Sequence, residues 1–220
     1  MPLIIGVTGS IASGKSLLCT HLAEAHGALH VDADREVHRM YALGTPGFER
    51  VVAEFGAEIV GADGVIDRRV LGSQVFGKPE RMEALRTAIG DIPAYFMALL
   101  DRWAMELPSE AIAVLEAVNL LENAYMTKAH AAWLVVTEDE TAITRLIQTR
   151  DLERSEAEQR LASARDWQER APAADRVFHN DGTTEAFVPE IEAAIAQALA
   201  AYRSGTLPAP RWREARATES

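Results

Sequence analysis

The 220-residue sequence has one cysteine, three lysines and no long apolar run, and each shortage excludes a class of protein. The single cysteine, Cys19, cannot form an internal disulfide and is typical of a chain that works in the reducing cytoplasm. No apolar stretch approaches the roughly 18 residues that a membrane-spanning helix needs. Because the N-terminus lacks a basic region followed by a long apolar stretch, we expect no signal peptide and no membrane partner.

The sequence also lacks an excess of positive charge. Lysine and arginine together number 22 against 33 acidic residues, so the formal net charge is −11. A nucleic-acid-binding surface would be basic, and we therefore expect no nucleic-acid partner. The only lysines are Lys15, Lys78 and Lys128. A match to a motif that requires lysine is therefore not a by-product of a high lysine content.

One short stretch near the N-terminus carries a strong chemical signal. The segment GVTGSIASGKS fits the pattern G-x-x-x-x-G-K-[S/T] through Gly9, Gly14, Lys15 and Ser16. The glycines let the backbone N–H groups turn toward phosphate oxygens, and the helix that follows adds its positive end. Lys15 can reach the β- and γ-phosphates of a nucleotide, and the Ser16 hydroxyl can bind Mg²⁺. The predicted P-loop contacts to nucleotide are Gly9, Ser10, Ile11, Ala12, Ser13, Gly14, Lys15, Ser16 and Leu17.

The rest of the chain alternates apolar strands with helices. Residues 3–9 predict a buried strand, Lys15 begins a helix that ends at Gly27, and 28–34 predict a second strand. This order forms a βαβ unit, which implies an α/β fold with a parallel sheet and helices on its faces, the three-layer P-loop NTPase arrangement. Further strands are predicted at 111–117, 131–137 and, more weakly, 175–181.

We predict one P-loop kinase domain over residues 1–202 with two helical additions. The helical pattern between the strands predicts an insertion at about 48–105, which the family resemblance described below would place on the acceptor side. A densely charged helical segment at about 138–170 is expected to form a lid. Residues 203–220 contain two prolines and few apolar residues, so we predict a mobile tail there.

Acidic residues end two of the predicted strands, where ligands of open α/β sheets gather. Asp32 and Asp34 are two residues apart and would share one face of a strand. Either could accept the proton of a substrate hydroxyl that attacks a γ-phosphate, whereas Asp34 could instead cap the following helix. Glu116 could hold Mg²⁺ through water, or it could be an ordinary surface or capping residue.

Arginines follow the strand predicted at 131–137. Phosphoryl transfer needs positive charge that arrives with the substrate, and a helical lid that carries arginines would supply it. Arg145 and Arg150 lie closest to the strand in sequence, so they are the candidates for this role. The others alternate with acidic residues and are expected to form a solvated face. They are Arg154, Arg160, Arg165, Arg170 and Arg176.

Four histidines lie near Cys19 in the sequence. His21, His26, His30 and His38 have no spacing typical of a zinc motif. A structural or surface role is therefore favoured over a metal site.

The motifs together resemble the dephospho-CoA kinase family, which is of the nucleoside-monophosphate-kinase type, over roughly residues 3–200. The resemblance rests on the P-loop, HVDAD at 30–34, and the blocks at 63–80, 149–165 and 173–182, in the family's order. It implies ATP-dependent phosphorylation of the 3′-hydroxyl of dephospho-CoA to give coenzyme A, with Mg²⁺ as cofactor. It also implies that Asp34 is the base and that Asn180 lies near the adenine of ATP.

The sequence departs from the family pattern at several positions. Ser10 and Ala12 replace glycines in the P-loop, and Gly90 and Asp91 stand where a histidine–proline pair is usual. Glu116 and Asn119 replace an aspartate and a proline, and the usual glutamine of the lid is replaced near Ala164.

Two alternatives stay open: a P-loop kinase for another nucleoside or nucleotide, and a non-catalytic ATP-binding paralogue. A monomer or weak homo-oligomer is expected.

Overall fold

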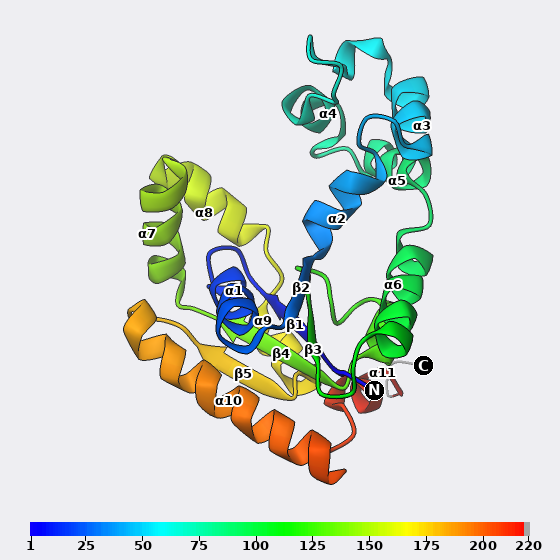
Figure 1. Cartoon of the computed structure of the whole chain (residues 1–220). Coiled ribbons are helices and arrows are strands. Elements are labelled where there is room, and N and C mark those ends of the chain that lie inside the picture. The colour runs from blue at the N-terminus through cyan, green and yellow to red at the C-terminus, as the bar shows by residue number, and fades with distance from the viewer. Residues whose placement is uncertain (218–220) are drawn as a thin grey trace. The chain divides into compact units, whose positions relative to one another are not determined.

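The computed structural model describes residues 1–217 of the chain (Figure 1). The chain forms two compact units, one made of Met1–Val31 with Leu100–Ser220 and the other of Asp32–Leu99. No helix in the described part of the chain is long and apolar enough to cross a membrane.

A five-stranded sheet with the order β2-β3-β1-β4-β5 forms the centre of the first unit. β1 pairs in parallel with β3 and β4, and β4 pairs in parallel with β5. The predicted α/β fold is confirmed. Each strand begins and ends within two residues of its predicted bounds. They are β1 (Leu3–Gly9), β2 (Leu29–Asp32), β3 (Ile112–Glu116), β4 (Ala131–Val136) and β5 (Arg176–His179).

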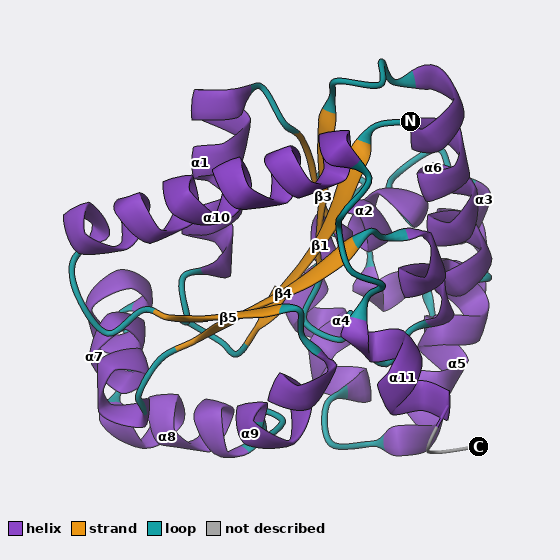
Figure 2. Cartoon of the chain, turned by 90° about the horizontal axis from the view of Figure 1, so that it is seen from below, coloured by secondary structure: helices purple, strands orange, loops and turns teal. Residues whose placement is uncertain are grey.

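β1 is buried along its whole length because helices cover both faces of the sheet. Its alternate residues Leu3, Ile5 and Val7 pack into one core with α1 (Lys15–His26) and α10 (Thr184–Ser204). These two helices lie on the same side of the sheet (Figure 2). As predicted, Gly27 ends α1, in the left-handed conformation that glycine adopts without steric cost.

Three helices follow β4 in the segment 138–170. α7 covers Asp139–Arg150, α8 covers Arg154–Ala162, and the short α9 covers Trp167–Arg170. Ile143 and Leu146 of α7 pack against Ala157 of α8, which holds these two helices together. Two 3₁₀ turns complete this unit between the strands, η2 (Ala124–Lys128) and η3 (Ala171–Ala173).

The second unit is helical. Its core includes buried Val51, Phe55, Ile59 and Leu71. The Arg50 guanidinium donates hydrogen bonds of 2.8 Å to the carbonyls of two residues at the end of α5. The helices are α2 (Ala33–Met40), α3 (Pro46–Phe55), η1 (Ala57–Ile59), α4 (Arg68–Val75) and α5 (Pro79–Ile89), followed by α6 (Ile92–Glu106), which ends in the first unit.

The segment predicted as a mobile tail contains regular structure. α10 continues to Ser204, and α11 covers Arg211–Ala217. Trp212 is buried with 4% of its surface exposed, and the backbone N–H of Arg211 donates a 2.8 Å hydrogen bond to Asp175. The burial of one large aromatic side chain therefore fixes a segment whose composition predicts none. Residues 218–220 of the predicted tail lie outside the described residues.

The buried Trp212 leads to a stability prediction. We expect Trp212→Ala to lower the free energy of unfolding by about 3 kcal/mol, the usual cost of deleting a buried large aromatic side chain. Arg211→Ala is the matched control, because Arg211 is exposed and its hydrogen bond comes from the backbone, so its effect should stay within about 0.5 kcal/mol. Urea unfolding measures both. Equal effects of the two substitutions would contradict the packing of α11.

Candidate active site

The P-loop connects the end of β1 to the start of α1. Gly14 stands at the N-cap of α1 with a φ of 95°, which non-glycine residues rarely adopt. A β-carbon at Gly14 would lie 2.1 Å from Nδ2 of Asn180, and one at Gly9 would lie 2.3 Å from the carbonyl oxygen of Val135. Both glycines of the sequence motif are therefore required by close approach of neighbouring atoms.

Several hydrogen-bond donors at the end of the loop have no protein partner among the described residues. No side chain caps α1, so the N–H groups of its first turn remain available. The Ser13 hydroxyl is fully buried and makes no hydrogen bond. Buried polar groups are normally paired, so these donors fit the phosphate oxygens that a helix N-terminus attracts.

Ala12 occupies a strained position in this loop. Its φ is 58°, in the left-handed region, which costs an alanine about 1–2 kcal/mol. Ala12 also packs beside Ile143 and Leu146 of α7, and this contact offsets part of the cost. The loop therefore keeps a left-handed residue where the family usually has a glycine.

Asn180 follows β5 and contacts the P-loop directly. It is buried with 3% exposed, and its Nδ2 donates a 2.8 Å hydrogen bond to the carbonyl of Ser13. Its Oδ1 lies 3.4 Å from Nη2 of Arg145 on α7, and the same guanidinium reaches the carbonyls of Ala12 and Gly182. The structure thus joins the P-loop, the residue after β5 and the first predicted lid arginine.

A cavity of about 290 Å³ lies beside this group of residues. Gly14 and Leu17 of the P-loop side, together with Asn180, form part of its wall. Its remaining lining comes from Ala12, Arg145, Gly182, Thr183 and Thr184. The volume lies near the lower end of the range of about 300–1,000 Å³ typical of small-molecule sites.

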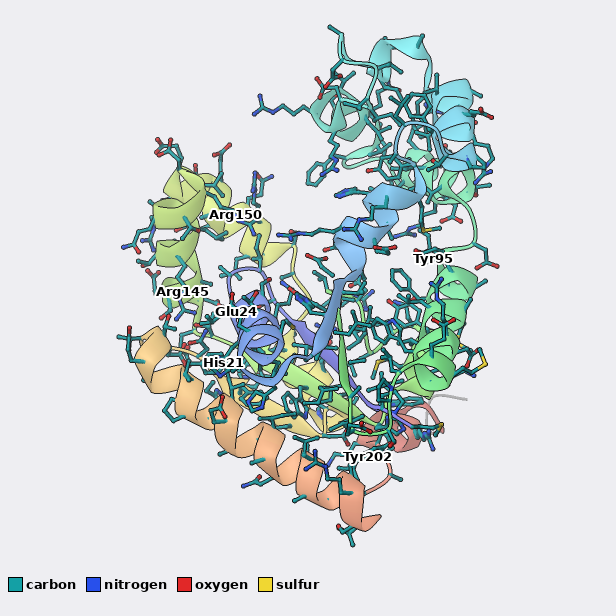
Figure 3. The ribbon with its side chains drawn as sticks, viewed as in Figure 1. His21, Glu24, Tyr95, Arg145, Arg150 and Tyr202 are labelled. Atoms are coloured by element: carbon teal, nitrogen blue, oxygen red, sulfur yellow. The ribbon has the colours of Figure 1, made fainter. Side chains whose placement is uncertain are left out.

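A second, more polar cavity of about 610 Å³ lies next to Ser10. It is lined by α7, α8 and the start of α9, including Glu138, Glu158, Arg165 and Asp166. Arg150, labelled in Figure 3, ends α7 and is exposed. It makes no hydrogen bond or ion pair with the described residues. Its guanidinium is therefore free to meet an anionic ligand.

The two predicted metal ligands lie together. Ser16 Oγ donates a 2.5 Å hydrogen bond to Oε1 of Glu116, the last residue of β3, and His30 Nε2 lies 3.0 Å from the other carboxylate oxygen. Burial alone would raise the pKa of Glu116, but hydrogen bonds from His30 and Ser16 and the charge of Lys15 lower it below its ordinary value. Glu116 is therefore an ionised, buried carboxylate.

The two aspartates of HVDAD differ from the sequence prediction. β2 ends at Asp32, so Asp32 and Asp34 do not share a strand face. The carboxylate of Asp32 caps α2 by accepting hydrogen bonds from the backbone N–H groups of Asp34 and Arg35 at 2.9 and 3.2 Å. The cap is therefore Asp32, whereas the sequence assigned that alternative role to Asp34. The exposed side chain of Asp34 stands in the first turn of α2.

Arg170 was wrongly expected to lie on a solvated face. It is 9% exposed, and its Nη2 donates hydrogen bonds to the Thr8 hydroxyl at 2.9 Å and the Val118 carbonyl at 2.8 Å. Its Nε lies 3.0 Å from Oε1 of Glu122. Arg170 therefore braces the residue that precedes Gly9 of the P-loop. Charge spacing gave no signal for this role, because the partners come from distant segments of the chain.

The buried position of Arg170 leads to a second stability prediction. We expect Arg170→Met to lower the free energy of unfolding by about 2–4 kcal/mol, because Glu122 and the Val118 carbonyl lose their cationic partner. Arg165→Met is the control, since Arg165 is 60% exposed and lies 3.7 Å from the same Glu122. Its removal should cost less than about 0.5 kcal/mol in urea unfolding. A similar loss in both variants would argue against a bracing role for Arg170.

Comparisons with known proteins show the family of this chain. A sequence model of the dephospho-CoA kinase family matches residues 3–186. A dephospho-CoA kinase of Symbiobacterium thermophilum is 38% identical over 87% of this chain and 79% of its own length, and one of Geobacter sulfurreducens is 37% identical over 86% and 95%. A crystal structure from Thermus thermophilus has a TM-score of 0.70 at 29% identity, covering 89% of this chain and 97% of that one. The chain belongs to the dephospho-CoA kinase family.

Proposed function

We propose that the chain transfers the γ-phosphoryl group of ATP to the 3′-hydroxyl of dephospho-CoA, and that its residues divide this reaction between a donor and an acceptor side. The activity itself follows from membership of the dephospho-CoA kinase family. The observation that supports the donor side is the P-loop, whose unpartnered N–H groups and buried Ser13 hydroxyl fit phosphate oxygens.

On the donor side, Lys15 and the loop N–H groups bind the β- and γ-phosphates of ATP. The adenine fits the cavity of about 290 Å³ beside Asn180, because the phosphates lie on the loop that forms its wall. Arg145 contacts Asn180 and the loop carbonyl of Ala12, so binding of phosphates to the loop would change the surroundings of its guanidinium. Arg150 supplies a second guanidinium when the lid closes over the transfer.

Ser16 and Glu116 would hold Mg²⁺. Both offer oxygen atoms, the ligands this ion prefers, and Glu116 is kept ionised despite its burial. When bound, Mg²⁺ neutralises charge on the phosphate oxygens. His30 donates to the other oxygen of Glu116 and so orients the carboxylate.

On the acceptor side, Asp34 receives the proton of the attacking hydroxyl. The side chain of Asp34 is exposed in the first turn of α2, where it can meet a substrate, whereas the carboxylate of Asp32 caps that helix. The chain passes from the sheet into α2 at this point, so the base follows the carboxyl end of β2, where ligands of α/β sheets bind.

The replacement of the family's histidine–proline pair has a local structural reason. Gly90 ends α5 with a φ of 122°, a conformation that a histidine would rarely adopt. Asp91 then accepts a 2.9 Å hydrogen bond from the N–H of Ala94 at the start of α6. The pair thus ends α5 and starts α6.

We further infer that the enzyme works in the cytoplasm as a monomer or weak homo-oligomer. The sequence has one cysteine and so cannot form a disulfide within the chain, as expected in a reducing compartment.

The acceptor itself is the first prediction of this proposal. With ATP and Mg²⁺, the purified chain should release ADP with dephospho-CoA at a rate well above the rates with nucleosides or nucleoside monophosphates. An ADP-release assay over that panel measures the preference. A higher rate with another nucleoside or nucleotide would favour a different acceptor, and ATP binding by calorimetry without transfer to any acceptor would indicate a non-catalytic paralogue.

The role of Asp34 is the second prediction. Asp34→Asn should lower kcat by about 10²–10⁴-fold with little change in the KM for ATP, because a positioned base is lost while the P-loop is intact. Asp32→Asn is the control. Asparagine caps a helix as well as aspartate does, so kcat should stay within about threefold of the parent value. A low kcat in Asp32→Asn and a normal one in Asp34→Asn would reverse the assignment.

A further inference from the structure

A second group of ligand-type side chains lies on the first unit, away from the P-loop. His21 and His26 of α1 converge on Glu192 of α10. His21 Nε2 lies 2.5 Å from Glu192 Oε1, and His26 Nε2 lies 3.0 and 3.1 Å from the two carboxylate oxygens. Figure 3 labels His21 on the side of α1 that faces α10. Three side chains from two helices therefore bring atoms that can bind a metal close together.

The geometry matches what a metal ion requires of its ligands. The nitrogen and oxygen atoms all lie within 4.8 Å of one another. Around tetrahedral zinc, with bonds of about 2.0–2.1 Å, neighbouring ligand atoms are about 3.3 Å apart. The side chains would have to separate by less than about 1 Å to admit the ion, and they are 20%, 24% and 43% exposed, so they have room to move.

The chemistry of the donor set selects the kind of ion. Imidazole nitrogen suits zinc and the later transition metals, whereas Mg²⁺ prefers sites built from oxygen atoms. The carboxylate of Glu192 supplies an oxygen ligand beside the two imidazole nitrogens. Three protein ligands and an exposed fourth side also leave a coordination position for water.

We propose that His21, His26 and Glu192 form a binding site for a divalent transition-metal ion, with zinc as the expected occupant. The ion joins α1 to α10 on the face of the sheet that both helices cover. The site uses neither the P-loop glycines nor Glu116, so it is distinct from the Mg²⁺ site of the reaction. The sequence alone favoured a structural or surface role for these histidines, because Glu192 is far from them along the chain.

One other group in the described part of the chain could compete for zinc. Cys19, His30 and Glu116 also place ligand atoms within 4.8 Å of one another. Glu116 already accepts the hydrogen bond of Ser16, and this group belongs to the catalytic site described above. Any test must therefore separate the two groups.

The experiment is a zinc titration of the full chain in competition with a chromophoric chelator. Glu192→Gln and His21→Gln should each raise the Kd for Zn²⁺ by at least about tenfold, since even the loss of an outer-shell partner costs 10–100-fold. Glu190→Gln is the matched control, because Glu190 is exposed on the same helix two residues away, and its Kd should not change. Cys19→Ala removes the competing group and should leave the Kd of the proposed site unchanged. Circular dichroism shows that each variant is folded.

A spectroscopic readout completes the test. Co²⁺ in place of Zn²⁺ should give the visible absorption of a low-coordinate nitrogen–oxygen site in the parent chain and in Cys19→Ala, and this absorption should be lost in Glu192→Gln. The proposal is overturned if Glu192→Gln binds zinc as tightly as the parent does. It is equally overturned if Cys19→Ala abolishes the binding. Neither result bears on ADP release with dephospho-CoA, so the proposed function is tested independently.

Discussion

The approach of Asn180 to the P-loop is the contact on which the donor side of the site depends. Its amide donates to the Ser13 carbonyl at 2.8 Å, and a β-carbon at Gly14 would occupy the same space. The contact fixes the loop from the far edge of the sheet, because Asn180 follows β5. Arg145 then reaches the other end of the same amide, so the loop, the sheet and α7 share one hydrogen-bonded junction.

The parts predicted correctly from the sequence are those that local patterns encode. β1 and its loop are contiguous, and apolar residues followed by glycines predict both the strand and the turn. The roles of Asp32 and Asp34 depended on where β2 ends, and strand ends are not fixed by alternation alone. The cap lies at Asp32, two residues before the aspartate that the sequence offered as an alternative cap. The prediction placed the pair in the right part of the fold but assigned the cap to the wrong aspartate.

The features that sequence missed depend on distant partners. Arg170 has the same local surroundings as other arginines of its segment, yet it is buried because Thr8, Val118 and Glu122 meet it from elsewhere. Trp212 lies in a segment of low apolar content, and its burial requires a surface that the sequence does not reveal. Burial is a property of the assembled fold, whereas composition describes only a neighbourhood in the chain.

The two helices of the proposed zinc site begin at the P-loop and at the cavity beside Asn180. α1 starts at Lys15 of the P-loop, and α10 starts at Thr184, which lines the cavity beside Asn180. A helix of 12 residues is about 18 Å long and transmits a shift of one end to the other, because its backbone hydrogen bonds make it stiff. An ion held by His26 at the last residue of α1 and by Glu192 in the third turn of α10 would restrain both helices. Because packed helices move as units, such a restraint would act on the P-loop and on the cavity beside Asn180, which lie at the starts of these helices.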